Sequence, residues 1–467
     1  MTTAAMSGQA GSRGPRRSAG DVPGPDLGRL RTLQLLRADA PAALSGLQRQ
    51  YGPITRLRVP VLGTIYVVSD PAVVQEVLTL SGRAFEKGVV RRGQDPAQPG
   101  PTPLTALLGQ GLLTSSGDLH KHQRRLLQPL FHRDRIAGYA TAFADLTAEA
   151  TRRWRDGETR PLHRDMTDLT LAIIARTVFD VSLGDGVMQV VRRAVDGGNQ
   201  RGIQFRPALF DRLPLPSARR RRAVMADLDR VIMQLVAQRR ALGANGSDLL
   251  SLLLSARDAD TGEPMDDRQV RDEALTILLA GHETTANALS WALHLISQRP
   301  DVQDRLGQEL TAVLDHRLPE VGDVPRLPYT AAVFNEAMRL YPPAWMMARH
   351  LMYDRTISGH DLPAGAMVLV SPYVVHRDPV LWPDPDAFDP ERWLTPDPGR
   401  HRYSFVPFGA GPRQCIGNSF AELEGIVCLA AMARDWTFHP TTTEPIRTRP
   451  AITLSPRGGL PLRLRHR

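Results

Sequence analysis

The sequence predicts one large, mainly α-helical domain with small β regions. Residues 135–255 contain several segments whose apolar residues recur with the 3.6-residue period of a helix. Residues 266–298 form the longest helical candidate, and Asp266 is suited to cap its start. Apolar residues alternate with polar or small ones over residues 51–59 and 64–68, which indicates a β-hairpin.

The composition is that of a folded protein. Its 467 residues are 42% hydrophobic, which is enough for a substantial core. The net charge is +9, yet of the 58 basic residues only Lys87 and Lys121 are lysine. This arginine skew is typical of a GC-rich genome, and because no nucleic-acid-binding motif accompanies it, we expect no nucleic-acid partner. A basic surface remains suited to docking an acidic protein.

Cysteine usage and the N-terminus indicate the compartment. Two cysteines exclude a disulfide scaffold and suit a reducing environment. The N-terminus lacks the apolar region of a signal peptide, and no run of about 18 apolar residues could span a membrane. We therefore expect a cytoplasmic protein with no membrane span. Residues 1–22 are expected to be a disordered leader, and residues 23–467 to form the single domain.

Caps and breakers predict the next elements in chain order. Asp70 caps a short helix that begins at Pro71, and the proline-rich residues 88–111 form an irregular connection. Residues 205–216 form a proline-broken connection between two helices. Residues 219–222 are four arginines, which we interpret as a solvated helix start; contact with a membrane surface or an anionic substrate is the alternative.

Three elements are predicted near the C-terminus. Residues 330–340 form a helix in which Glu336 and Arg339 make an i,i+3 ion pair, and two prolines end it. Residues 418–434 form a second helix. Residues 452–464 contain turn residues and are expected to form a terminal hairpin.

The loop of residues 408–417, Phe-Gly-Ala-Gly-Pro-Arg-Gln-Cys-Ile-Gly, places Cys415 directly before a predicted helix. Glycines allow close backbone approach, and N–H groups at a helix start favour a thiolate over a thiol. Phe408 can cover one side of the sulfur, and Arg413 is a ready partner for an anion. We interpret Cys415 as a thiolate that ligates a haem iron, the alternative being a buried structural cysteine. Cys428, in an apolar run, is predicted to lie in the core.

Two further motifs place polar groups on helices. His120 and Arg124 are four residues apart and therefore share one helical face, which could bind a carboxylate or simply face solvent. Residues 280–285, Ala-Gly-His-Glu-Thr-Thr, interrupt the apolar interior of the longest helix. Burying such groups costs free energy unless they are partnered or functional, and a mere helix kink is the alternative.

The pattern Phe-x-x-Gly-x-x-x-Cys-x-Gly, filled by Phe408, Gly411, Cys415 and Gly417, resembles the haem-binding loop of the cytochrome P-450 monooxygenases. Residues 280–285 resemble the oxygen-activating motif of the same family. The resemblance covers nearly the whole chain. It implies the family's helical-prism fold, haem b as the cofactor, and Cys415 as its axial thiolate ligand.

The same resemblance implies roles for further residues. Thr284 would hydrogen-bond dioxygen, Glu283 would relay protons, and Gly281 would let the helix open over the iron. Four side chains are implied to hold the haem propionates, namely His120, Arg124, Arg349 and Arg413. Three side chains are implied to lock the segment that leads to the haem loop in a purely structural triad, namely Glu336, Arg339 and Arg392.

The implied activity is insertion of one oxygen atom of dioxygen into a lipophilic small molecule. A terpenoid of secondary metabolism is favoured over a fatty acid, and Trp345, Met346 and Met347 could line an apolar pocket. Electrons are expected from a separate ferredoxin and its reductase, and the protein is expected to be a monomer. A non-catalytic haem-thiolate sensor and a peroxygenase or isomerase are the alternatives, and the pair Glu283–Thr284 argues against both.

Overall fold

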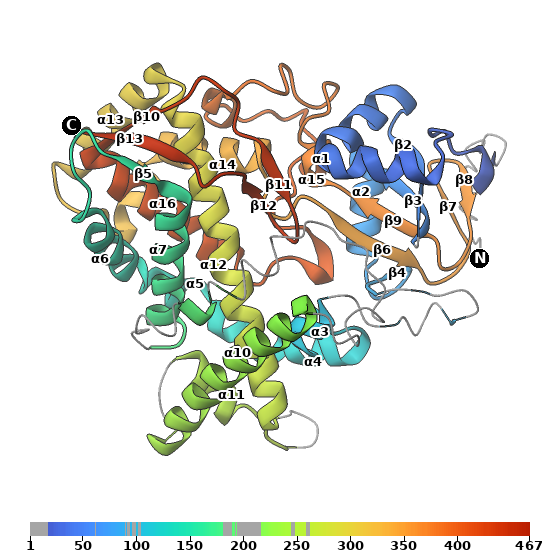
Figure 1. The fold of residues 1–467 in the computed structure, drawn as a ribbon, viewed down its shortest axis with the longest axis horizontal. Coiled ribbons are helices and arrows are strands. Elements are labelled where there is room, and N and C mark those ends of the chain that lie inside the picture. Colours follow the sequence, from blue (N-terminus) through green and yellow to red (C-terminus); the bar gives the residue numbers. More distant parts are fainter. Residues whose placement is uncertain are drawn as a thin grey trace, which may run out of the picture.

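The computed structural model describes most of the chain, namely residues 17–60, 62–88, 90, 94–95, 100, 104–180, 189–191, 193, 216–243, 248–257 and 262–467. A large helical part lies beside a smaller part that holds the main sheet (Figure 1). The predicted mainly α fold with small β regions is therefore confirmed. The predicted connection over residues 205–216 lies outside the described residues up to residue 215.

Helices make up the largest share of the described residues. They are α1 Arg29–Tyr51, α2 Pro71–Thr79, α3 Thr105–Leu108, α4 Gly117–Leu127, α5 Arg133–Ala137, α6 Ala140–Thr151, α7 Leu162–Thr177, α10 Pro216–Ala241, α11 Leu249–Ser255, α12 Asp267–Ser297, α13 Pro300–Leu314, α14 Pro328–Leu340, α15 Pro372–Val375 and α16 Asn418–Asp435. Short 3-10 helices are η1 Ala19–Asp21, η2 Gln128–Phe131, η3 Val321–Arg326, η4 Pro390–Trp393, η5 Arg402–Ser404 and η6 Gly411–Arg413.

The strands form four small sheets among the described residues. They are β1 Arg17–Ser18, β2 Ile54–Val59, β3 Gly63–Val68, β4 Phe85–Glu86, β5 Thr159–Pro161, β6 Met347–Leu351, β7 Arg355–Ile357, β8 His360–Leu362, β9 Met367–Val370, β10 Trp436–Pro440, β11 Thr448–Pro450, β12 Leu454–Pro456 and β13 Pro461–His466. The largest sheet has the order β2-β3-β9-β6-β4, with β3 and β9 parallel. The others are β10-β13-β5, β1-β8-β7 and the pair β11-β12.

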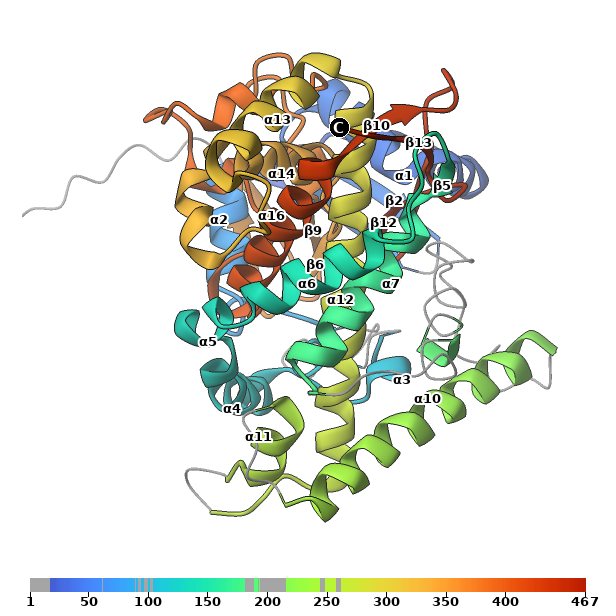
Figure 2. The ribbon, with the colours of Figure 1, turned by 90° about the vertical axis from the view of Figure 1, so that its left-hand side faces the viewer.

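Helix α12 is the predicted long helix and runs through the helical part (Figure 2). It begins where predicted because the Asp266 carboxylate accepts a hydrogen bond from the Gln269 N–H at 2.7 Å. Most of its residues are buried, and it contacts α7, α14 and α16. The helix therefore forms the centre around which the other helices pack.

The N-terminal predictions are confirmed in outline. β2 and β3 pair in antiparallel register, and Asp70 caps α2 by accepting from the Ala72 and Val73 N–H groups. Residues 17–22, which we placed in the leader, are structured: β1 pairs with β8, and Val22 is buried. The connection predicted to be irregular contains the one-turn helix α3.

The predicted terminal hairpin over residues 452–464 is wrong. β12 pairs with β11, whereas β13 pairs with β10 and β5. Between the two strands Gly458 and Gly459 adopt φ values of 91° and 85°. This left-handed backbone turns the chain out of one sheet and into the other, so the two strands never meet.

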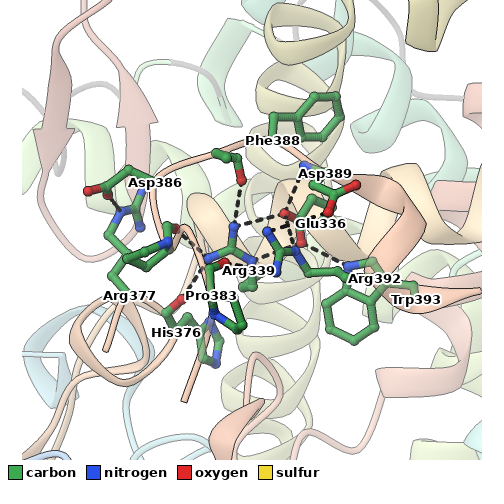
Figure 3. A network of polar contacts seen from close by, with 12 residues as sticks. Glu336, Arg339, His376, Arg377, Pro383, Asp386, Phe388, Asp389, Arg392 and Trp393 are labelled. Atoms are coloured by element: carbon green, nitrogen blue, oxygen red, sulfur yellow. Dashed lines mark hydrogen bonds and ion pairs between the residues drawn. The ribbon is translucent and has the colours of Figure 1, made fainter. Parts of the chain in front are cut away.

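The predicted structural triad is confirmed as a buried network (Figure 3). The Glu336 carboxylate accepts two hydrogen bonds from Arg339 at 2.8 Å and one from Arg392 Nε at 3.0 Å. It also accepts from Trp393 Nε1 at 2.8 Å and from the Asp389 N–H at 3.1 Å. Glu336 and Arg339 are fully buried, so this carboxylate fixes α14 to the segment that leads toward Cys415.

We expect Glu336→Gln to destabilise the fold by about 3 to 5 kcal/mol, because two buried cations lose their only shared carboxylate. Urea unfolding of the two proteins measures this difference. The control is Asp301→Asn, which breaks the exposed ion pair between Arg299 and Asp301, and which should cost at most about 1 kcal/mol. A loss from Glu336→Gln no larger than that of the control would contradict the prediction.

Candidate active site

The loop that carries Cys415 is closed on itself. The Cys415 N–H donates to the Phe408 carbonyl at 2.9 Å. Gly409 and Gly411 have φ values of 65° and 66°, a region that disfavours side chains. A Cβ on Gly411 would lie 2.4 Å from the Leu78 carbonyl oxygen, so the loop packs directly against the end of α2. The backbone itself therefore favours glycine at positions 409 and 411.

The Cys415 side chain is exposed, although the surrounding protein weakens its hydration. This desolvation raises the pKa of the Cys415 thiol, opposed by the Gly417 N–H and by Arg124. The expectation that the loop alone favours a thiolate is therefore wrong, because desolvation is the larger effect. Coordination to a metal ion deprotonates a thiol outright, so an accessible thiol in this setting suits a bound iron.

Two predicted cations link the loop to the segment around α4. Arg124, on α4, donates to the Gln414 carbonyl at 2.7 Å. Arg413 donates to the Ser115 carbonyl at 2.7 Å and pairs with Glu86 at 2.9 Å. The segment before α4 and the loop before α16 therefore meet at Cys415.

Three more basic side chains lie in the same cluster. Arg349 and Arg413 each lower the pKa of Lys87, which burial brings to about 7. Burial also lowers the pKa of His120 to about 3, with contributions from all four neighbouring cations. We call this group the basic cluster; its members are Lys87, His120, Arg124, Arg349 and Arg413. It holds four cations against the one carboxylate of Glu86, and so it suits a ligand with two carboxylates, such as haem.

Lys87 was not predicted as a site residue. Its neighbour Glu86 stands in β4, and the Lys87 ammonium donates to the Leu113 carbonyl. Both residues lie more than thirty positions from the His120 motif, and no periodicity links them to it. The one available signal was the rarity of lysine in this chain.

The middle of α12 is accessible although the helix is otherwise buried. Ala280 is exposed, and Gly281, Glu283 and Thr284 are half-buried. The Thr284 hydroxyl donates to the Ala280 carbonyl at 2.8 Å, and the helix is continuous here. A Cβ on Gly281 would lie 2.8 Å from Ile174 Cδ1, so this glycine also allows α7 to pack closely.

Two acids of α12 hold the connection that precedes α4, an arrangement that the sequence did not predict. Asp272 accepts from the Gln110 N–H at 2.7 Å, and Glu273 accepts from the Leu112 N–H at 2.9 Å. Glycine at position 109 is required, since a Cβ there would overlap the Asp272 carboxylate. Burial raises the pKa of Glu273 to about 7.

The other predicted side chains divide into core and surface. Cys428 is fully buried and accepts from the Thr147 hydroxyl at 3.2 Å, so the core prediction is confirmed. Trp345 is 1% exposed and donates to the Ala451 carbonyl, so its prediction as a pocket-lining residue is wrong. Arg219 and Arg222 are exposed on α10, as expected of a solvated helix start.

This fold and motif set correspond to one protein family. The family model Cytochrome P450 matches residues 23–462, so the chain belongs to the cytochrome P450 family. Cyclooctatin synthase of Streptomyces melanosporofaciens is 37% identical over 431 residues, which cover 90% of both chains. Cyclooctat-9-en-7-ol 5-monooxygenase of the same organism is 37% identical over 80% of both chains. Pentalenene oxygenase of Streptomyces avermitilis is 35% identical over 85% of both chains.

The chain is accordingly a cytochrome P450 monooxygenase related to bacterial enzymes. Membership implies a haem with a cysteine thiolate, and the exposed Cys415 beside the basic cluster fits that group. It also implies dioxygen and electron-donor partners. Two of these relatives are named as a monooxygenase and an oxygenase, which supports the monooxygenase over the non-catalytic sensor. Among the described helices, none is long and apolar enough to cross a membrane.

We expect Cys415→Ser to abolish the thiolate-type Soret band of the reduced carbon-monoxide complex, because a serine hydroxyl cannot supply the thiolate. Absorption spectra of the purified proteins measure this band. The matched control is Cys428→Ala, whose buried sulfur lies in the core, and which should keep the band. Loss of the band in the control but not in Cys415→Ser would reverse the assignment.

We expect Glu273→Gln to change how stability depends on pH. The folded-state pKa of Glu273 is raised from 4.5 to about 7, so its neutral form stabilises the fold below pH 4.5, and that stability is lost as the pH rises toward 7. The loss amounts to about 3 kcal/mol. Glutamine cannot titrate, yet its oxygen can still accept from Leu112. Between pH 4.5 and 7, the free energy of unfolding of the variant should therefore rise relative to that of the wild type when both are measured at several pH values.

The control for this experiment is Glu149→Gln, at an exposed position on α6. It should leave the pH dependence of stability unchanged. Parallel curves for Glu273→Gln and the wild type would show that burial of Glu273 does not control stability in this pH range.

Proposed function

We propose that Cys415 is the axial ligand of haem b and that the basic cluster binds its propionates. The observation that carries this proposal is an exposed thiol in a loop that contains Arg413 and accepts a hydrogen bond from Arg124. Arginine suits this task because its fork donates two hydrogen bonds to a carboxylate. Phe408, which directly precedes Gly409, would flank the sulfur.

Thr284 and Glu283 would act on the opposite side of the cofactor. When bound, haem supplies the oxygen chemistry: dioxygen takes two electrons and two protons, one atom enters a substrate C–H bond, and the other leaves as water. The protein must bring those protons to one place. We infer that Glu283 relays them from solvent and that the Thr284 hydroxyl would hydrogen-bond the dioxygen, since both side chains are accessible on α12. Gly281 would leave room beside them.

The substrate class that we propose is a terpenoid of secondary metabolism. This rests on the relatives, whose names refer to cyclooctatin, to cyclooctat-9-en-7-ol and to pentalenene. These are mainly hydrocarbon molecules, so the side chains that meet such a substrate should be apolar. A fatty acid is the second candidate, and it would require a cation near the substrate.

Ferredoxin and its reductase are the proposed electron donors, and the protein is proposed to act as a monomer in the cytoplasm. The basic net charge supports docking of an acidic redox protein. The domain of residues 23–467 would hold the whole site, because its motifs span residues 120–417.

We expect cyclic terpene hydrocarbons to shift the Soret band of the ferric protein toward the high-spin position, because a bound substrate displaces water from the iron. Optical titrations with a diterpene hydrocarbon, a sesquiterpene hydrocarbon and a long-chain fatty acid measure this. Terpene affinity should exceed fatty-acid affinity by at least about tenfold, or about 1.4 kcal/mol. A shift with fatty acids alone would reject the terpenoid class while leaving the haem assignment intact.

A further inference from the structure

The carboxylate of Glu283 is reached by a line of three side chains that no sequence motif indicated. The Thr453 hydroxyl, in the turn between β11 and β12, donates to Glu283 Oε1. The Asn287 amide nitrogen donates to Thr453 Oγ1 at 3.1 Å. The Asn287 amide oxygen lies 2.9 Å from Nε2 of His163, near the start of α7. Two other parts of the chain, α7 and the turn between β11 and β12, are therefore linked to the acid on α12.

These hydrogen bonds all run in one direction. Because Asn287 uses its amide nitrogen on Thr453, its oxygen can only accept, and His163 Nε2 must carry the proton. Because Thr453 accepts from Asn287, its single hydroxyl proton points to Glu283. Asn287 is fully buried, so bulk water does not reach its amide and cannot replace these hydrogen bonds. Each donor therefore aims the next one at the carboxylate.

The turn that carries Thr453 is itself fixed. Trp345 Nε1 donates to the Ala451 carbonyl at 3.1 Å on one side of Thr453. Trp291 Nε1, from α12, donates to the Leu454 carbonyl at 3.0 Å on the other side. Two buried indoles thus clamp the backbone on both sides of this threonine, and its hydroxyl has a defined position relative to α12.

We propose that Thr453 is a positioning residue for Glu283, oriented in turn by Asn287 and His163. The proposal rests on the proposed function, in which Glu283 moves protons. A glutamate side chain loses rotamer freedom when one oxygen is held, and a held carboxylate presents its other oxygen in one place. Proton transfer requires its partners within hydrogen-bond reach, so this restraint matters for reaction more than for binding.

The test is Thr453→Val, which keeps the shape and removes the hydroxyl. We expect the product formed per pair of electrons to fall roughly threefold to tenfold, as for other misplaced reacting groups. The remaining electrons should appear as hydrogen peroxide, formed from dioxygen with two electrons and two protons. Substrate affinity and the substrate-induced Soret shift should not change. Thr453→Ser, which restores the hydroxyl, should recover the product yield.

The matched control lies on the same hairpin. Thr448, on β11, is half-buried, and its hydroxyl has no hydrogen-bond partner among the described residues. Thr448→Val therefore makes the same chemical change without touching the line of donors, and it should leave the product yield at the wild-type level. An equal yield in Thr453→Val and the wild type would overturn the proposal.

Infrared spectroscopy of the ferric protein supplies a readout that does not depend on turnover. The carboxylate band of Glu283 is identified by its loss in Glu283→Gln; it should shift in Thr453→Val and return in Thr453→Ser. An unshifted band would overturn the proposal even if the yield fell. If the band shifts in Thr453→Val but the wild type itself forms no product, the proposed function is contradicted and the positioning role of Thr453 stands.

Discussion

The position of the segment that leads to the Cys415 loop depends on the hydrogen bonds of one buried carboxylate, that of Glu336. A charge removed from water is tolerated only when its lone pairs are fully used, and Glu336 accepts five hydrogen bonds. Arg339, which it holds, donates onward to the carbonyls of His376, Pro385 and Ala387. The ion pair between Glu336 and Arg339 thus fixes the chain from His376 to Arg392, a mostly irregular segment. The loop that carries Cys415 follows this segment in the sequence.

Helix α12 uses the same principle in a different way. Four of its buried side chains find partners outside the helix: Asp272 and Glu273 hold the connection before α4, while Asn287 and Trp291 hold the turn between β11 and β12. An apolar helix of the same length would pack equally well but would fix neither segment. These four side chains, which lie outside residues 280–285 and which no sequence motif singled out, therefore place loops, whereas the accessible stretch near Thr284 is left for chemistry.

Local patterns could be predicted from the sequence, whereas long-range pairings could not. The cap at Asp266 and the glycines around Cys415 follow from the chemistry of neighbouring residues, and the structure confirms both. Lys87 joins the basic cluster only through tertiary packing, which the spacing of residues along the sequence does not predict. The strands after Ile452 were assigned to one hairpin because their turn residues are local, but their partners lie far away in the sequence. Trp345 was misplaced for a similar reason: apolar character does not separate a pocket wall from a core.

The electrostatics of the site indicate that cofactor binding and folding are coupled. Without a partner, desolvation disfavours the Cys415 thiolate, and burial, followed by mutual repulsion, lowers the pKa of Lys87, Arg349 and His120. A haem, which would offer an iron to the thiolate and two carboxylates to the cations, would oppose both costs at once. Any ligand that binds the folded state alone stabilises it by mass action. Because these costs are concentrated where α4, β4 and the cysteine loop meet, haem binding and the docking of these three segments should be one cooperative event.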